Sequence, residues 1–310
     1  AGRGRSRALC VGINAYPPPN RLSGCVADAR NWGAALGALG YQVEFLLDGQ
    51  ATRENILNHL SQLLRGSTAG DSIVFQYAGH GTQVKDLDGD ETDGQDEAIC
   101  PVDFASGSFI IDDDFRRVFD LTPGGVSVTC FMDCCHSGTI TRLVAGLSEA
   151  NALGVPASKA RFLTATPEME RAHEQFRRGL GSRAAAPLRG PDSMKEVLFS
   201  ACLPSEVAYE TGGSGDFTSR AVPVLETGLT NDQFLERVVQ AFGVPARQHP
   251  NADYPPGWGS RPVLGQGAAA AAADGRSFEP APADIAQSLR TIAEWLHAEA
   301  YAAPQHAPGH

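Results

Sequence analysis

The sequence lacks a run of apolar residues long enough to cross a membrane or to form a signal peptide. The N-terminal apolar stretch, residues 8–13, has six residues, whereas a membrane helix needs about 20 and a signal core about 7 to 15. No internal repeat is present, so a repeat architecture is excluded as well. We therefore expect no membrane partner.

The cysteines lack the pairing and spacing of a disulfide framework or a zinc site. There are seven of them, an odd number, with no CxxC pair. Cys10, Cys100, Cys130 and Cys202 lie in or beside apolar, strand-like runs. Reduced thiols of this kind are typical of cytoplasmic proteins, so we expect a cytoplasmic location.

Basic residues are scarce in one segment, residues 86–120. It holds twelve Asp or Glu against Arg116 and Arg117, and so accounts for nearly all of the formal net charge of -11. Because nucleic acid phosphates bind basic patches, this balance excludes nucleic acid as a partner and favours cations or basic peptides.

What the chain does contain is an alternation of apolar runs and helix-spaced segments. With 310 residues and 42% hydrophobic residues, it can form one large domain with appendages. The alternation predicts an α/β fold with a mostly parallel central sheet flanked by helices, in which ligands bind at the carboxyl ends of the strands. The apolar runs are residues 8–13, 41–47, 72–77 and 125–132, and the helical segments are 25–39 and the one that Thr52 caps.

The later part of the chain changes character. Residues 141–195 hold nine Lys or Arg against five Asp or Glu with little periodicity, so we expect a flexible basic insertion. Residues 196–202 resume a strand and 217–225 and 234–242 are helical, which gives a domain over residues 1–264. The remainder, 265–310, is an Ala/Gly linker and a helical tail.

A histidine and a cysteine follow two of the predicted strands. His80 lies in Ala-Gly-His-Gly-Thr at 78–82, and Cys135 lies in Asp-Cys-Cys-His-Ser-Gly at 133–138. Strand ends of a parallel sheet meet at one edge, where an imidazole can take the proton from a thiol and so create a nucleophilic thiolate. The pattern predicts a Cys-His dyad, and the alternative is two buried thiols with a satisfied histidine.

The neighbouring residues suggest how such a dyad is completed. Adjacent residues in extended backbone point to opposite sides, so only one of Cys134 and Cys135 can face His80, and we choose Cys135 because it is further from the buried strand. His136 is a weaker alternative base, since sequence neighbours seldom align for proton transfer. Gly81, which lacks a Cβ, and the N–H of Cys135 are the expected donors to an oxyanion.

Four ordered motifs stand out in the chain: 22–28 (Leu-Ser-Gly-Cys-Val-Ala-Asp), 77–81 (Tyr-Ala-Gly-His-Gly), 96–103 (Asp-Glu-Ala-Ile-Cys-Pro-Val-Asp) and 133–138. Together they resemble the type I metacaspases of the caspase-like peptidase clan. The resemblance implies a caspase-haemoglobinase fold, with His80 and Cys135 as the dyad of a cysteine endopeptidase that cuts protein or peptide substrates after Arg or Lys.

The resemblance also implies a substrate-binding pocket. Cys25, Asp28, Ala78 and Asp133 match positions that line the specificity pocket of the family. Two buried carboxylates can hold a guanidinium bidentately, which is the physical reason for a basic preference. Ala78 stands where the family often has serine, and for Asp28 a solvated helix position is the alternative.

Calcium is the cofactor that the resemblance implies, as an activator. Asp96, Asp112 and Asp113 match the calcium-binding positions of the family, but Arg142 stands where a fourth carboxylate is expected. Hard oxygen ligands suit Ca²⁺. A solvated acidic loop, and acids that favour the N-terminus of a helix, are the alternatives.

Self-processing is a further expectation, because an enzyme specific for basic residues could cut its own basic segment; no bond is preferred. Two rival functions stay open: a catalytically silent caspase-like scaffold and a calcium-responsive interaction module. We expect a monomer. The candidate basic residues are Arg161, Arg171, Arg177, Arg178, Arg183, Arg189 and Lys195.

Overall fold

The computed structural model describes residues 4–89, 91, 94–135, 158–181 and 194–265. The chain divides into two compact units, residues 1–274 and 275–310, and every described residue lies in the first. The predicted helical tail, His136, Arg142, Arg183 and Arg189 therefore lie outside the described residues.

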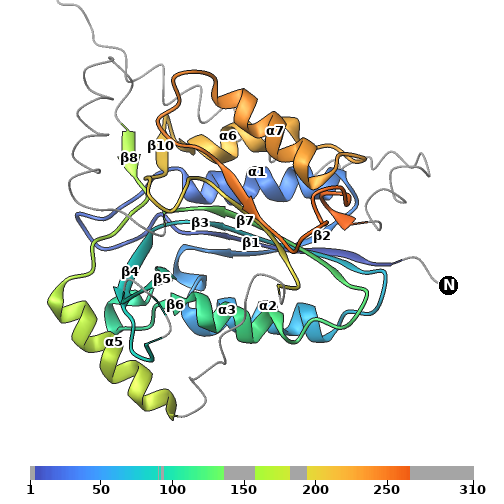
Figure 1. Ribbon diagram of the computed structural model, residues 1–310. Helices are drawn as coiled ribbons and strands as arrows, with labels where there is room; N and C mark the ends of the chain where they lie inside the picture. Colours follow the sequence, from blue (N-terminus) through green and yellow to red (C-terminus); the bar gives the residue numbers. More distant parts are fainter. Residues whose placement is uncertain (1–3, 90, 92–93, 136–157, 182–193, 266–310) are drawn as a thin grey trace, which may run out of the picture. The chain divides into compact units, whose positions relative to one another are not determined.

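A six-stranded sheet forms the centre of the first unit (Figure 1). Five strands are parallel, and the edge strand β12 runs antiparallel to its neighbour β9. The predicted mostly parallel sheet is confirmed. In spatial order the strands are β12 (Asn251–Asp253), β9 (Val197–Ser200), β7 (Ser127–Asp133), β3 (Ser72–Ala78), β1 (Ser6–Gly12) and β2 (Gln42–Leu47).

Helices cover both faces of this sheet (Figure 1). One face carries α1 (Cys25–Ala38), α6 (Asp216–Ala221) and α7 (Asn231–Phe242), and the other carries α2 (Arg53–Arg65) and α3 (Asp112–Phe119). Short 3₁₀ helices lie at Asp48–Gln50, Phe104–Ser106 and Val222–Val224.

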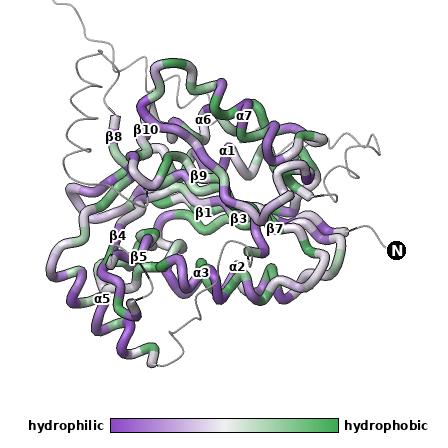
Figure 2. Tube along the Cα trace, in the orientation of Figure 1, coloured by the Kyte–Doolittle hydropathy of each residue, from purple (hydrophilic) through white to green (hydrophobic). Residues whose placement is uncertain are grey.

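Each helix buries one side against the sheet. In α2 the Thr52 side chain accepts a hydrogen bond from the N–H of Asn55, which caps the helix as predicted, and Ile56 and Leu60 are fully buried. On the opposite face Trp32 stacks on Phe131 with ring centroids 4.2 Å apart. Figure 2 shows the resulting pattern, with hydrophobic central strands and alternating polar and apolar segments along α3 and α7.

Two small antiparallel sheets lie beside the central one. The first joins β4 (Gly81–Lys85), β5 (Gln95–Ile99) and β6 (Ile110–Ile111), and the second joins β8 (Ser158–Ala160), β10 (Tyr209–Thr211) and β11 (Ser214–Gly215). Strand β5 lies within the stretch that the sequence predicts to be an acidic loop. The acidic residues of β5 are uncommon in strands, so the sequence does not predict it; the strand forms because it pairs with β4.

The basic segment 141–195 differs from the prediction of a flexible insertion. Its described part holds β8 and a helix, α5 (Pro167–Leu180), which Thr166 caps and Pro167 opens. Arg177 and Arg53 both pair with Asp114, at 2.8 and 2.9 Å. Met169 of α5 packs against the core, whereas the buried side chains further along the helix are His173 and Arg177, so its buried face is largely polar and its hydrophobic periodicity is weak.

Among the described residues, no helix combines the length and the apolar character that a membrane span requires.

Candidate active site

The two predicted catalytic stretches leave the central sheet next to each other. Strands β3 and β7 are parallel neighbours, and their last residues, Ala78 and Asp133, are register partners. His80 and Cys135 each follow two residues later. The topology therefore brings both stretches to the carboxyl edge of the sheet, where the sequence predicts them.

His80 is buried and is held by two hydrogen bonds. Its backbone N–H donates to the Tyr16 hydroxyl at 3.0 Å, and its Nε2 lies 2.7 Å from the carbonyl oxygen of Asn20. A carbonyl can only accept, so Nε2 carries the proton and Nδ1 is left with a free lone pair. Within the described chain Nδ1 has no hydrogen-bond partner.

This environment keeps the imidazole neutral. Burial lowers the pKa of His80 to about 4, more than the hydrogen bond to Asn20 raises it. A neutral ring with an unprotonated Nδ1 can accept a proton from a thiol.

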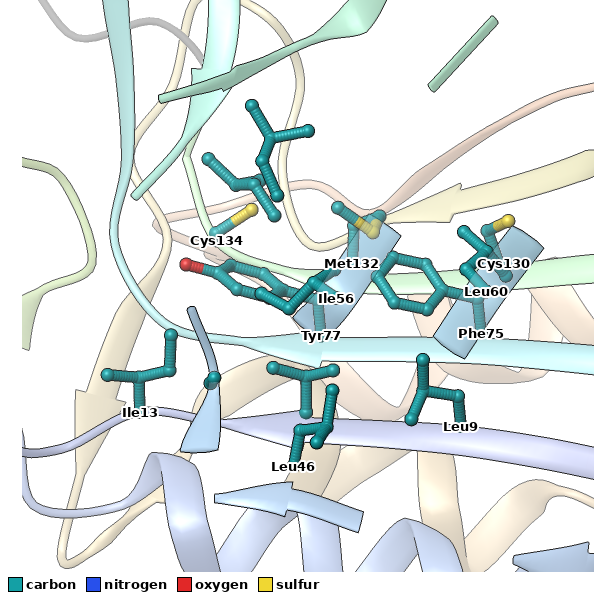
Figure 3. Packing of buried hydrophobic residues seen from close by; sticks show 14 of the residues in the cluster. Leu9, Ile13, Leu46, Ile56, Leu60, Phe75, Tyr77, Cys130, Met132 and Cys134 are labelled. Atoms are coloured by element: carbon teal, nitrogen blue, oxygen red, sulfur yellow. The ribbon is translucent and has the colours of Figure 1, made fainter. Parts of the chain in front are cut away.

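The two cysteines point to opposite sides, as predicted. Cys134 packs in the hydrophobic cluster on the α2 face, where its sulfur lies near Tyr77 (Figure 3). Cys135 belongs to the cluster on the α1 face, and its Sγ accepts a hydrogen bond of 2.7 Å from the N–H of Ala208. The thiol is therefore held against the backbone of Ala208.

The two expected oxyanion donors converge on a single atom. The N–H groups of Gly81 and Cys135 donate to the carbonyl oxygen of Arg161 at 3.0 and 3.3 Å. A Cβ on Gly81 would lie 1.5 Å from the carbonyl oxygen of Cys135. Only glycine allows these two backbones to approach so closely.

The guanidinium of Arg161 lies in a fully buried pocket of three carboxylates. Its Nη1 is 3.1 Å from Oδ2 of Asp133, and its Nη2 pairs with Asp28 and lies 3.4 Å from Oε2 of Glu210. The fold thus brings together the two carboxylates that the sequence singles out, adds Glu210, and fills the site between them with an arginine.

Neighbouring residues hold each carboxylate in place. Thr218 donates to Asp133 through its N–H at 3.0 Å and its hydroxyl at 2.6 Å. Ser214 donates to Asp28 at 2.6 Å, and Ser23 donates to Glu210 at 2.8 Å. The pocket is therefore pre-organised for a cation.

The charges of the pocket are unbalanced, because three carboxylates face one guanidinium. Burial raises the pKa of Asp133 to about 6, although Arg161 opposes this. Burial also opposes ionisation of Glu210, but Arg161 and the hydrogen bonds from Ser23 and Gly24 lower its pKa. Without a positive side chain in the pocket, three buried carboxylates would repel one another.

The other two predicted pocket residues lie around these carboxylates. The Sγ of Cys25 is 3.9 Å from Oε2 of Glu210, and burial raises its pKa, so it is a neutral thiol. Ala78 is buried in β3 beside Asp133.

Sequence reasoning missed several residues of the site. Asn20 and Ala208 act through backbone atoms, which leave no signal in the side-chain pattern. Glu210 follows the apolar residues 207–209, and a carboxylate in that context is the one signal that could have been used. Ser214 in β11 and Thr218 in α6 carry no signal in the sequence, and only the fold brings their hydroxyl groups to Asp28 and Asp133.

Two of the three predicted calcium residues form salt bridges with arginines of α3. Asp112 and Asp113 pair with Arg116, and Asp113 also lies 3.3 Å from Arg117. Asp96, on β5, is buried. Over the part of the chain that the structure describes, no group of three or more His, Cys, Asp or Glu is placed to hold a metal ion.

Comparison with known proteins gives the family. Residues 6–144, which include His80, Cys135, Asp28 and Asp133, match the metacaspase peptidase C14 domain family. These residues form a metacaspase domain. The family predicted from the four motifs is thus confirmed.

Curated metacaspases are similar to this chain over different lengths. Metacaspase-1 of Sclerotinia sclerotiorum is 43% identical over 148 residues, which cover 44% of this chain and 34% of that protein. Metacaspase-1A of Aspergillus clavatus is 32% identical over 255 residues, which cover 78% of this chain and 51% of that protein. The chain thus spans between about a third and a half of these metacaspases.

Solved structures agree on the fold. Protein GSU0716 of Geobacter sulfurreducens superposes with a TM-score of 0.64 at 26% identity, covering 80% of this chain and 92% of that one. Caspase-1 of Spodoptera frugiperda superposes with a TM-score of 0.51 at 13% identity, covering 81% and 86%. The metacaspase domain has the predicted caspase-haemoglobinase fold.

Proposed function

We propose that this protein is a cysteine endopeptidase that cleaves peptide bonds after arginine or lysine. The observation that supports this most is the position of Arg161. Three buried carboxylates surround its guanidinium, and its carbonyl oxygen accepts hydrogen bonds from the N–H groups of Gly81 and Cys135. A substrate arginine in that place would put its own carbonyl beside the candidate nucleophile.

The residues of the site can carry the steps of peptide hydrolysis. His80 accepts the thiol proton at Nδ1, and the Cys135 thiolate attacks the carbonyl carbon. The N–H groups of Gly81 and Cys135 stabilise the oxyanion. His80 then gives the proton to the departing amine, and water releases the acyl group from sulfur in a second round. Asn20 keeps the ring in the tautomer that these transfers need.

The pocket favours arginine over lysine. Two nitrogens of one guanidinium reach Asp28 and Asp133 on opposite sides, whereas a lysine offers a single point charge. We expect both residues to be accepted, with arginine preferred.

A peptide-library cleavage assay tests this proposal against a silent scaffold. Peptides with arginine before the scissile bond should be cut by the wild type and by Cys134→Ala, and not by Cys135→Ala. Cys134 is a matched control, because it is the adjacent buried thiol on the opposite face. Equal residual activity of the two variants would contradict the assigned nucleophile, and no cleavage by any of them would favour the scaffold.

Calcium stimulation remains a prediction from the family resemblance. The salt bridges of Arg116 to Asp112 and Asp113 neutralise two of the three expected ligands. We expect chelator to lower the cleavage rate and added calcium to restore it. Full activity in chelator, together with no calcium binding by calorimetry, would contradict the prediction.

The proposal also covers the cellular location and the oligomeric state of the protein. None of the seven cysteines, all of which are described and buried, forms a disulfide, and this supports the proposed cytoplasmic location. We expect a monomer, which light scattering coupled to size-exclusion chromatography can check.

A further inference from the structure

Cys202 is a buried thiol that the proposed reaction does not use, and it lies close to the candidate nucleophile. Strands β7 and β9 are parallel neighbours, and their register places Met132 opposite Ser200. The pairing continues with a hydrogen bond of 3.0 Å from the N–H of Ala201 to the carbonyl of Met132. Cys135 and Cys202 follow directly on these two strands. The two thiols therefore leave the carboxyl edge of the sheet from adjacent positions.

One short stretch of backbone contacts both sulfur atoms. The Cys202 sulfur lies 3.6 Å from the carbonyl oxygen of Glu206, and the N–H of Ala208 donates to the Cys135 sulfur at 2.7 Å. The thiols also meet each other, because a hydrogen bond with the Cys135 side chain, followed by burial, raises the pKa of Cys202. A hydrogen bond that raises a thiol pKa stabilises the protonated form, so the Cys202 S–H faces the Cys135 sulfur.

Gln248 holds this stretch of backbone in place from its two ends. The Gln248 side chain is fully buried; its Nε2 donates to the carbonyl of Ala201 at 3.0 Å, and its Oε1 accepts from the N–H of Tyr209 at 3.1 Å. Residues 202–208 are thus closed into a loop over the two thiols. The spacing between the sulfurs is set by the fold and not by a free segment.

A cavity of about 410 Å³ lies on the side of Cys202 that faces away from the dyad. Cys202 is among its lining residues, whereas Cys135 and His80 are not. Leu203 and Pro204 line it too and are exposed, so the cavity is open to solvent there. Its volume lies within the range of small-molecule sites, about 300 to 1,000 Å³. A small thiol can therefore reach Cys202 without entering the carboxylate pocket.

We propose that Cys135 and Cys202 form a reversible disulfide when a hydroperoxide oxidises the active site. The disulfide would switch off cleavage and protect the nucleophile from irreversible oxidation until a small thiol reduces it. The effect on activity rests on the proposed peptidase function, but the formation of the disulfide does not.

Oxidation takes two balanced steps. The Cys135 thiolate attacks one oxygen of the hydroperoxide and becomes a sulfenic acid, while the other oxygen leaves as water or an alcohol with the proton that His80 took from the thiol. The Cys202 sulfur then attacks the Cys135 sulfur. The S–O bond breaks, and the hydroxide leaves as water with the Cys202 proton. A hydroperoxide reaches Cys135 by the route of the peptide substrate, since it is much smaller.

Reduction restores the nucleophile and consumes two molecules of a small thiol. The first attacks the Cys202 sulfur from the cavity, forms a mixed disulfide and releases Cys135. The second frees Cys202 and forms the disulfide of the reductant. Cys202 is the poorer leaving group because its pKa is raised, which favours release of Cys135 in the first exchange.

Cys202→Ser tests the protective role, with Cys134→Ala as the matched control. Cys134 is the buried thiol next to Cys135, but it packs on the opposite face of the sheet. Each protein is treated with excess hydrogen peroxide and then dithiothreitol, and its activity is compared with its own untreated activity. We expect the recovered fraction to be about fivefold or more higher in wild type and Cys134→Ala than in Cys202→Ser, where sulfenic acid goes on to sulfinic acid, which thiols do not reduce. Equal recovery in all three would overturn the inference.

Peptide mapping by mass spectrometry without reductant gives a readout that needs no activity. Peroxide-treated wild type and Cys134→Ala should contain a peptide that links residue 135 to residue 202, and Cys135→Ala should not. A link from Cys134, or sulfinic acid at Cys135 with no link, would overturn the inference even if the reduced protein cleaves peptides. The expected link in a protein that cleaves no peptide when reduced would keep the thiol pair and contradict the peptidase.

Discussion

At the residue scale, the site depends on three carboxylates that are buried together. Asp28, Asp133 and Glu210 are all nearly inaccessible to solvent, and each accepts hydrogen bonds from the surrounding backbone or hydroxyl groups. Buried carboxylates held in this way have been desolvated before any ligand arrives, so a guanidinium gains strong, charge-assisted hydrogen bonds on entry. The proposed preference for arginine therefore depends on these few carboxylate oxygens.

Replacing Asp133 by asparagine removes one of these charges with little change of shape. We expect Asp133→Asn to lower kcat/KM for arginyl peptides about 100-fold, because a hydrogen bond to a charged partner contributes about 1.5 to 3 kcal/mol. Steady-state kinetics on one peptide series measure the loss. The control is Glu226→Gln, which alters an exposed carboxylate that pairs with Arg237 and should leave kcat/KM unchanged. An Asp133→Asn enzyme with unchanged arginine preference would contradict the pocket assignment.

Gly81 offers a second test at this scale. Its substitution by alanine would place a Cβ 1.5 Å from the Cys135 carbonyl oxygen, so the backbone that carries both oxyanion donors has to shift. We expect kcat to fall by 100-fold or more, since one such donor contributes about that factor. Gly124→Ala is the matched control, because its Cβ meets no atom within 4 Å. Similar kcat values for the two variants would show that the donors lie elsewhere.

At the element scale, short strands and one docked helix complete what the central sheet begins. Strand β10 supplies Glu210 and is the partner of β8, while α6 supplies Thr218 to Asp133. Helix α5 is held by Arg177 on Asp114 and by Nδ1 of His173, which lies 3.0 Å from the carbonyl oxygen of Gly107. These contacts join segments more than 60 residues apart in sequence, and they fix the chain that leads away from the pocket.

The docking of α5 can be tested with two neighbouring arginines. Arg177 is 8% exposed in its ion pair, whereas the Arg178 side chain is 78% exposed and lies 3.4 Å from Glu174. We expect Arg177→Leu to lower the free energy of unfolding by about 1 to 3 kcal/mol, because Asp114 loses one of its buried partners. Arg178→Leu should change it by less than about 0.5 kcal/mol. Urea denaturation measures both, and equal effects would contradict a docking role for the buried pair.

At the scale of the whole molecule, the parallel order of β1, β3 and β7 gathers the loops that follow these strands at one edge of the sheet. Asn20, His80 and Cys135 come from three such loops; His80 and Cys135 are buried, and Asn20 is half-buried. The cost is a buried histidine whose pKa is lowered by burial, so its protonation in acid destabilises the fold.

The pH dependence of stability follows from the pKa of His80. In the unfolded chain the imidazole titrates near 6.5, but in the folded protein its pKa is about 4, so the unfolded state binds more protons between these values and stability falls as the pH falls. We expect His80 to make the protein about 2 kcal/mol less stable at pH 5 than at pH 7. Urea denaturation at both pH values, compared between wild type and His80→Gln, isolates this contribution. The same loss in both proteins would contradict a depressed His80 pKa.

The sequence alone determined the parts that depend on local pattern. Apolar runs mark β1, β3 and β7 because buried parallel strands are largely hydrophobic, and the mixed run of the edge strand β2 was still sufficient to predict it. The residues after β3 and β7 mark His80 and Cys135 because strand ends of such a sheet carry ligand sites. The motifs then gave the family. The alternation of residues in extended chain separated Cys134 from Cys135.

Only the tertiary structure decided what depends on distant parts of the chain meeting. Glu210 joins Asp28 and Asp133 across gaps of 182 and 77 residues, and Asn20 orients His80 through a backbone carbonyl that no side-chain pattern can reveal. Helix α5 is docked through ion pairs, and Arg161 is one of several basic residues until the fold places its guanidinium among three carboxylates and its carbonyl between Gly81 and Cys135. Periodicity records which residues are buried, but the partners of a buried charge are chosen by long-range packing.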